Sequence, residues 1–150
     1  MYIDGTDVSI LYDLDASAVT LTSLTVGANF TSTIGLPEIN ETGNYPEYRD
    51  DYWKISATTV TIGRGEGNGS GRLKINFGAN AAAIEVIATG AALEQGVPTA
   101  ILLGTHAANT LEVHSGSVGM AAFVGETSNI ATLRNANGEV QCGAGCTLTT

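Results

Sequence analysis

Residues 99–134 (TAILLGTHAANTLEVHSGSVGMAAFVGETSNIATLR) are almost free of charge and are cut by glycine every few residues into short apolar pieces. In one piece, Leu111 and Val113 alternate with Glu112 and His114. Side chains change sides at each residue of an extended chain, so this alternation puts the apolar residues on one face. The pieces are too short for ordinary helices and indicate β-strands with one buried face. The pattern therefore predicts an all-β fold.

The same reasoning identifies strands elsewhere. Residues 19–26 are rich in β-branched side chains, and residues 72–77 alternate with Leu73, Ile75 and Phe77 facing inward. Residues 81–88 could form a helix by alanine propensity, but Gly90 and their β-branched content favour a strand. A helical turn is expected at 91–95 and an exposed glycine-rich turn at 63–71. Further strands are expected at 8–12, 58–62, 100–103, 110–114, 118–124, 129–134, 139–143 and 147–149.

A Thr-Leu pair recurs in several of these strands, and its last three leucines (Leu111, Leu133 and Leu148) are 22 and 15 residues apart. Similar short strands at spacings of this order are typical of a parallel β-helix, or solenoid, in which each coil stacks on the one before. A β-sandwich or jelly roll would give the same strands with different partners. Small inward residues, Asn or Thr near turns and few hairpin signals favour the solenoid.

The length of 150 residues suits one folded unit, within which charge is unevenly distributed. Residues 1–53 carry nine acids and one arginine, whereas residues 54–150 carry six acids and five bases. We therefore expect acidic, aromatic-rich N-terminal strands and an irregular arm in 1–53, and a glycine-punctuated solenoid in 54–150. The acidic balance argues against nucleic acid as a partner. No apolar run is long enough to span a membrane, and the start of the chain lacks a secretory signal, which predicts folding in a cytoplasm.

The aromatic residues of the arm are the first candidate site. They form either a local mini-core or a contact surface, because tyrosine, tryptophan and arginine are enriched at binding hot spots. We take five residues as candidate partner-binding anchors: Tyr45, Tyr48, Arg49, Tyr52 and Trp53.

Two cysteines and two histidines are candidate ligands or reactive groups. The spacing of Cys142 and Cys146 suits neither a redox pair nor a zinc knuckle, so packed core cysteines are favoured, with a disulfide as the alternative if the protein ends up outside the cell. His106 and His114 lack a ligand at a suitable spacing and are interpreted as surface or turn residues, with an inter-chain metal as the alternative. We therefore predict no metal and no cofactor.

Catalytic patterns are weak. Glu47, Asp50 and Asp51 could be the paired carboxylates of a glycoside hydrolase, but acids in a loop beside Arg49 are more simply solvated. The glycines from Gly63 to Gly71 fit neither dinucleotide-binding nor phosphate-loop spacing, and no nucleophile elbow occurs. The sequence therefore predicts a protein that is not an enzyme.

Two segments, SGRLKINFG (70–78) and LLGTHAANTLEVHSGSVGMAAFVGETSNIATLR (102–134), resemble β-solenoid structural proteins of tailed bacteriophages, of the capsid decoration (cement) or tail-fibre type. The resemblance covers roughly residues 54–150 and lies in the general sequence pattern rather than in a catalytic motif. It implies a structural virion protein, assembled in the host cytoplasm. The expected form is a homotrimeric capsid decoration protein that binds the major capsid protein or other virion subunits and stabilises the head lattice. The alternative is a carbohydrate-binding or carbohydrate-cleaving module of a tail fibre, tailspike or surface adhesin.

Overall fold

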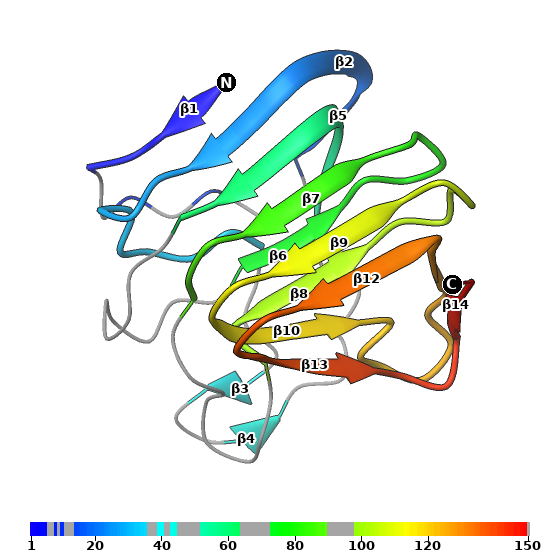
Figure 1. Cartoon of the computed structure of the whole chain (residues 1–150). Helices are drawn as coiled ribbons and strands as arrows, with labels where there is room; N and C mark the ends of the chain where they lie inside the picture. The colour runs from blue at the N-terminus through cyan, green and yellow to red at the C-terminus, as the bar shows by residue number, and fades with distance from the viewer. Residues whose placement is uncertain are drawn as a thin grey trace.

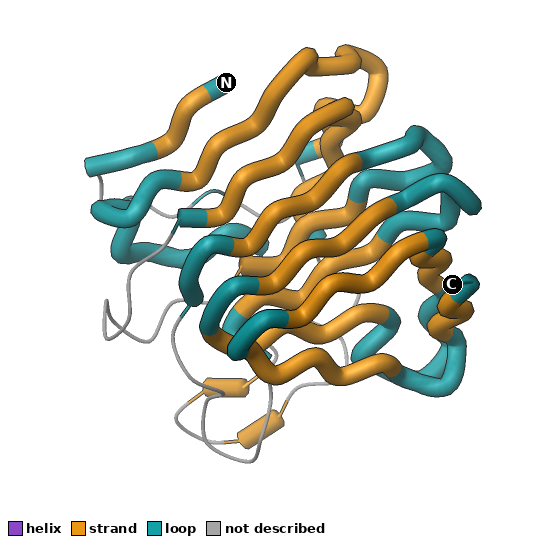
Figure 2. Tube along the Cα trace, in the orientation of Figure 1, coloured by secondary structure: helices purple, strands orange, loops and turns teal. Residues whose placement is uncertain are grey.

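A computed structural model describes residues 1–5, 8, 10, 14–35, 39–40, 43–44, 52–63, 73–89 and 98–149. Within these ranges the chain forms strands and turns and no helix, as the orange and teal tube of Figure 2 shows. The predicted all-β class is confirmed. The predicted glycine-rich turn (apart from Gly63), the helical turn at 91–95 and most of the strand at 8–12 lie outside the described residues.

The largest sheet has ten strands among the described residues, and every pairing within it is parallel. Parallel pairing throughout differs from the antiparallel pairing that defines a sandwich or jelly roll. The strands are β1 (Tyr2–Ile3), β2 (Asp15–Val26), β5 (Trp53–Ile62), β6 (Leu73–Asn76), β7 (Ala83–Val86), β8 (Ala100–Leu103), β9 (Thr110–Val113), β10 (Gly116–Met120), β12 (Thr132–Asn135) and β13 (Gly138–Cys142).

Two small sheets complete the described structure. β11 (Ser128–Ile130) pairs in parallel with β14 (Cys146–Leu148). β3 (Ile39–Asn40) pairs in antiparallel fashion with β4 (Gly43–Asn44). The β3–β4 pair lies apart from the large sheet in Figure 1.

The large sheet consists of two rows that share β5. The first row runs β1, β2, β5, β7, β9, β12, and the second runs β5, β6, β8, β10, β13. The start of β5 pairs with β6, and its end pairs with β7, so this long strand turns the corner between the rows. At the other end β12 and β13 come into contact, so the curved sheet is nearly barrel-shaped (Figure 1).

The two rows enclose one apolar core. Val60, Ile84 and Leu111 occupy matching positions on successive strands of the first row, and all three are buried. Ile75 and Leu102 do the same in the second row. Burial of a side chain of this size stabilises the fold by roughly 1.5–3 kcal/mol relative to exposure. The stacked apolar positions therefore hold the two rows together.

Several strand predictions match the structure, and two need correction. The strand at 100–103 has the predicted bounds, Leu73, Ile75 and Phe77 are buried as expected, and residues 83–86 form a strand rather than a helix. The strand expected at 118–124 ends at Met120, because Ala121 has a φ of 49°, outside the extended region. The strand expected at 129–134 is two strands, since the chain bends at Ala131, whose N–H donates to the Asn109 carbonyl at 2.7 Å.

The Thr-Leu repeat is partly structural. Leu111 and Leu133 are direct register partners on β9 and β12, so the spacing of 22 residues corresponds to one step along the first row. Leu148 instead pairs with Ile130 in the β11–β14 sheet. The spacing of 15 residues therefore does not correspond to a step along either row.

Candidate functional site

The outward side of the first row is polar, and we call it the polar face. On each strand the residues between the core positions point away from the core. The register aligns Glu85, Glu112 and Arg134 across three adjacent strands. The polar face is made of Thr59, Thr61, Ala83, Glu85, Thr110, Glu112, Thr132 and Arg134, all exposed or partly exposed.

A charged cluster lies on the polar face. Arg134 Nη1 is 3.9 Å from Glu112 Oε2, and His114 Nε2 lies 3.2 Å from Glu85 Oε1 and 3.6 Å from Glu112 Oε1. Glu85 and Glu112 are direct neighbours across the sheet, and like charges in that position repel. Arg134 and, when it is protonated, His114 offset this repulsion. Ion pairs this exposed contribute about 0–1 kcal/mol, so the cluster adds little to the stability of the fold.

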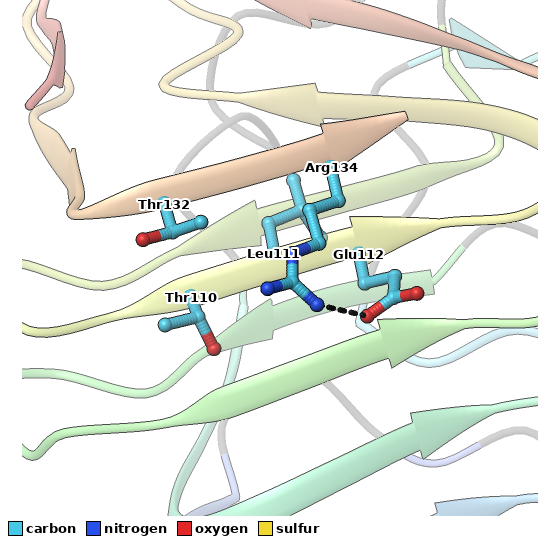
Figure 3. Close-up of a pocket in the computed structure, with 5 residues that line it drawn as sticks. All are labelled: Thr110, Leu111, Glu112, Thr132 and Arg134. Carbon is cyan, nitrogen blue, oxygen red and sulfur yellow. Dashed lines mark ion pairs between the residues drawn. The ribbon is translucent and has the colours of Figure 1, made fainter. Parts of the chain in front are cut away.

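A shallow depression of about 240 Å³ lies beside the cluster, lined by Thr110, Leu111, Glu112, Thr132 and Arg134. Figure 3 shows the Arg134 side chain lying over the sheet and reaching towards Glu112. The lining offers hydroxyl, carboxylate and guanidinium groups, which are suited to hydrogen bonds with a polar surface or ligand. Within the described ranges, no cluster of three or more His, Cys, Asp or Glu side chains is placed to hold a metal ion.

The outward side of the second row is different, and we call it the covered face. Over β6 and β8 and just after β10 it consists of Lys74, Ile101, Leu103 and Ala121, all buried. The rings of Tyr52 and Phe123 pack over it, and Lys74 Nζ lies 4.9 Å and 5.7 Å from their centroids. Sequence reasoning missed the burial of Lys74, because the alternation of its strand assigns it to solvent and the two covering rings lie far away in sequence.

The five predicted anchors have different outcomes. Tyr45, Tyr48 and Arg49 lie outside the described residues. Tyr52 is 2% exposed and Trp53 1% exposed. The Tyr52 hydroxyl donates a hydrogen bond of 2.6 Å to Glu126 Oε1, while Trp53 belongs to the main core. Both rings therefore pack against other parts of the same chain.

An apolar groove of about 180 Å³ lies near the N-terminus, beside the first half of β2. Met1, Leu14 and Val19 are large apolar residues that line it and are about half exposed or more. Below them lies Trp53, whose Nε1 is buried and has no hydrogen-bond partner within the described structure. Exposed apolar residues gathered in one place are typical of contact surfaces. The full lining is Met1, Leu14, Ala16, Val19, Leu21, Trp53 and Ile55.

The remaining candidates lie apart from this groove. Cys142, at the end of β13, is exposed, and the half-buried Cys146 begins β14 four residues later. Burial, together with the neighbouring Cys142, raises the pKa of Cys146 to about 12. His106 lies in a turn, where its Nδ1 accepts a hydrogen bond from the Ala108 N–H at 3.1 Å, and His114 belongs to the charged cluster. The acids Glu47, Asp50 and Asp51 lie outside the described residues.

Comparison of the chain with protein-family models, with curated proteins and with solved structures finds no match. Among the residues that the structure describes, none forms a helix of the length and apolarity needed to cross a bilayer.

Proposed function

We propose that this chain is a β-solenoid that serves as a structural virion protein, specifically a homotrimeric capsid decoration protein of a tailed bacteriophage. Support for the solenoid comes from the order of strands. Each circuit of the chain adds one strand to the first row and then one to the second, as in β7 then β8, β9 then β10, and β12 then β13. Each new strand lies parallel to the equivalent strand of the circuit before, which is how solenoid repeats stack.

The observation that carries the assembly role is the C-terminal end of the stack. Within the described structure, β12, β13 and β14 each have a paired strand on one side only. Leu133, Val140 and Cys146 pack against the core there but are only partly buried, and Leu148 is 44% exposed. A sheet edge with apolar side chains is prone to pair with another chain unless something covers it. Any protein layer packed on this edge would provide that cover, and we propose that a second subunit or the surface of a shell does so.

The N-terminal end offers a second contact surface. Its apolar groove is open. In sequence, residues 1–53 also carry eight more negative than positive charges. A trimer that decorates a lattice needs one surface for its own subunits and another for the shell. We assign the C-terminal edge to subunit contacts and the N-terminal segment, which is acidic in sequence, to the shell.

Native mass spectrometry tests the trimer directly. We expect the mass of three chains, and we expect Leu133→Lys together with Leu148→Lys to shift the population to monomer. Val124→Lys is the matched control, because Val124 is apolar and 100% exposed but lies on the turn between β10 and β11, outside the three edge strands. A wild-type chain that remains monomeric at every concentration would count against the trimer.

Attachment to a shell is tested by co-sedimentation with empty shells assembled from the major capsid protein encoded in the same genome. We expect the wild-type chain to pellet with the shells and to be displaced by salt, because an acidic surface would contribute to attachment. A chain that stays in the supernatant would contradict the decoration role while leaving the trimer open to its own test.

A second candidate function, a carbohydrate-binding or carbohydrate-cleaving module, is favoured by the polar face. Its threonine hydroxyls, the Glu112 carboxylate and the Arg134 guanidinium are arranged to hydrogen-bond a polar ligand. A glycan array separates the two candidates. Binding that is lost in Glu112→Gln and in Thr132→Ala would favour the glycan module over the decoration protein.

A further inference from the structure

The last turn of the described chain brings its two cysteines together. Cys142 ends β13 and Cys146 begins β14, with Gly143, Ala144 and Gly145 between them. The Cys146 N–H donates to the Gly143 carbonyl at 2.9 Å, which closes a tight turn. The two cysteines therefore stand at the two ends of one hydrogen-bonded turn, four residues apart.

The turn is fixed on the circuit before it. The Gly143 N–H donates to the Met120 carbonyl at 2.9 Å, and the Gly145 carbonyl accepts from the Ser128 N–H at 3.1 Å. A Cβ on Gly143 would collide with the Ala121 carbonyl, and one on Gly145 would collide with the Glu126 carbonyl. Both glycines are therefore needed for this close approach, and the backbone between the cysteines is held in place.

The two thiols differ in access. Cys142 is exposed, whereas Cys146 is half-buried and packs against the core. A thiol attacks a disulfide as its thiolate, and burial disfavours this charged form. An exposed thiol therefore reacts before a buried one. The raised pKa of Cys146, about 12, points the same way because little thiolate forms there at neutral pH.

We propose that Cys142 and Cys146 form a reversible disulfide that closes the last turn, with Cys142 reacting first and Cys146 completing the bond. With oxidised glutathione as the oxidant, the Cys142 thiolate attacks one glutathione sulfur and releases the other half as glutathione thiolate. That thiolate takes the proton of Cys146, whose sulfur then attacks Cys142 Sγ and releases the second glutathione. Two cysteine thiols are oxidised to one disulfide, and one glutathione disulfide is reduced to two thiols.

This bond would close the exposed end of the stack at β13 and β14, in an oxidising environment only. The proposal does not depend on the assembly role, because it concerns only the chemistry of one turn. It fails or holds whether or not the chain forms a trimer.

The experiment treats the full reduced chain with oxidised glutathione at mildly alkaline pH and follows intact mass. We expect wild type to lose the mass of two hydrogen atoms and to regain it with dithiothreitol. Cys146→Ser should gain the mass of one glutathione, and Cys142→Ser should gain it at least about tenfold more slowly. Acid quenching of wild type at early times should place the transient glutathione on Cys142 by peptide mapping, which needs no variant.

Two results would overturn the proposal. Wild type that stops with glutathione on both cysteines, or that links to a second chain, would show that the two sulfurs cannot join within one turn. Equal rates for the two serine variants, or a transient glutathione on Cys146, would overturn the order of reaction.

Discussion

The polar face and the covered face belong to two rows of one sheet, and both show the same alternation in sequence. On the polar face the residues between core positions, such as Thr110 and Thr132, are in contact with solvent. On the covered face Ile101 and Leu103 hold equivalent positions and are buried beneath Tyr52 and other packed side chains. Alternation thus identifies the residues that point to the core. Whether the residues on the opposite side are exposed or buried depends on what packs over them.

The cations of the two faces show the same contrast. Arg134 is 74% exposed and lies beside Glu112 on the polar face. Lys74 is 0% exposed and lies under the rings of Tyr52 and Phe123. An ammonium group taken out of water loses its hydration, and aromatic faces return part of that loss by cation–π attraction. The burial of Lys74 therefore depends on the covering layer, whereas Arg134 needs no cover.

The largest effect is expected where a charge enters the covered face. Ile101→Asp should destabilise the fold by at least about 3 kcal/mol, because it buries a carboxylate and removes a packed side chain. Thr110→Asp is the matched control at the equivalent position of the polar face and should change little. Urea unfolding measures both. Equal losses would show that the two faces do not differ in the way described.

The next effect concerns a corner of the first row. Asn109 Oδ1 accepts from the buried Ala82 N–H at 2.9 Å, and its Nδ2 donates to the Asn129 carbonyl at 3.2 Å, so one side chain bridges three circuits. Asn109→Ala leaves a buried donor unpaired and should cost about 2 kcal/mol in the free energy of unfolding. Asn137→Ala, at an exposed turn, should be neutral. If both variants are neutral, the row is not stabilised at this corner.

A smaller effect is expected from the cover itself. Tyr52→Phe keeps the ring over Lys74 but removes the hydrogen bond to Glu126, for an expected loss of about 1.5 kcal/mol. Tyr2→Phe removes a hydroxyl that donates to Asp4 Oδ2 at 2.9 Å on the exposed surface, and thermal unfolding should not register it. A loss in Tyr2→Phe as large as that in Tyr52→Phe would remove the distinction between the two environments.

The smallest effect is expected on the polar face. Glu112→Gln removes the partner of Arg134 and also relieves the repulsion with Glu85, so stability should change by less than about 0.5 kcal/mol. Any remaining difference in stability between the variant and wild type should vanish in high salt, because exposed ion pairs are screened. Chemical denaturation at low and high salt provides the measurement, and a salt-independent loss above 1 kcal/mol would mean that this cluster is part of the packed structure.

The sequence predicted the inward side of the sheet and little of what lies outside it. Leu73, Ile75 and Phe77 were assigned to the core from alternation alone, because a two-residue period is visible within a few positions. The break at Ala121 was missed, since a left-handed φ in a non-glycine residue has no local signal. Which strand pairs with which was open between solenoid and sandwich, because the same strand list permits both.

The candidate site was harder to predict for the same reason. In the charged cluster, Glu85, Glu112 and Arg134 are brought together by register, and only His114 is a near neighbour in sequence, two residues from Glu112. Tyr52 and Trp53 were chosen as anchors from residue type, and their burial comes from long-range packing that composition does not encode. Only the cysteine pair was visible in advance, because its two members are near neighbours in the chain.

The step-by-step register of the first row has a consequence for synthesis. In that row β7, β9 and β12 each lie on the strand one circuit earlier, as Ile84 lies beside Val60 and Leu133 beside Leu111. When β7, β9 or β12 leaves the ribosome, the strand on which it packs has therefore already been translated. The strands of the first row can therefore become ordered from the amino end as translation proceeds.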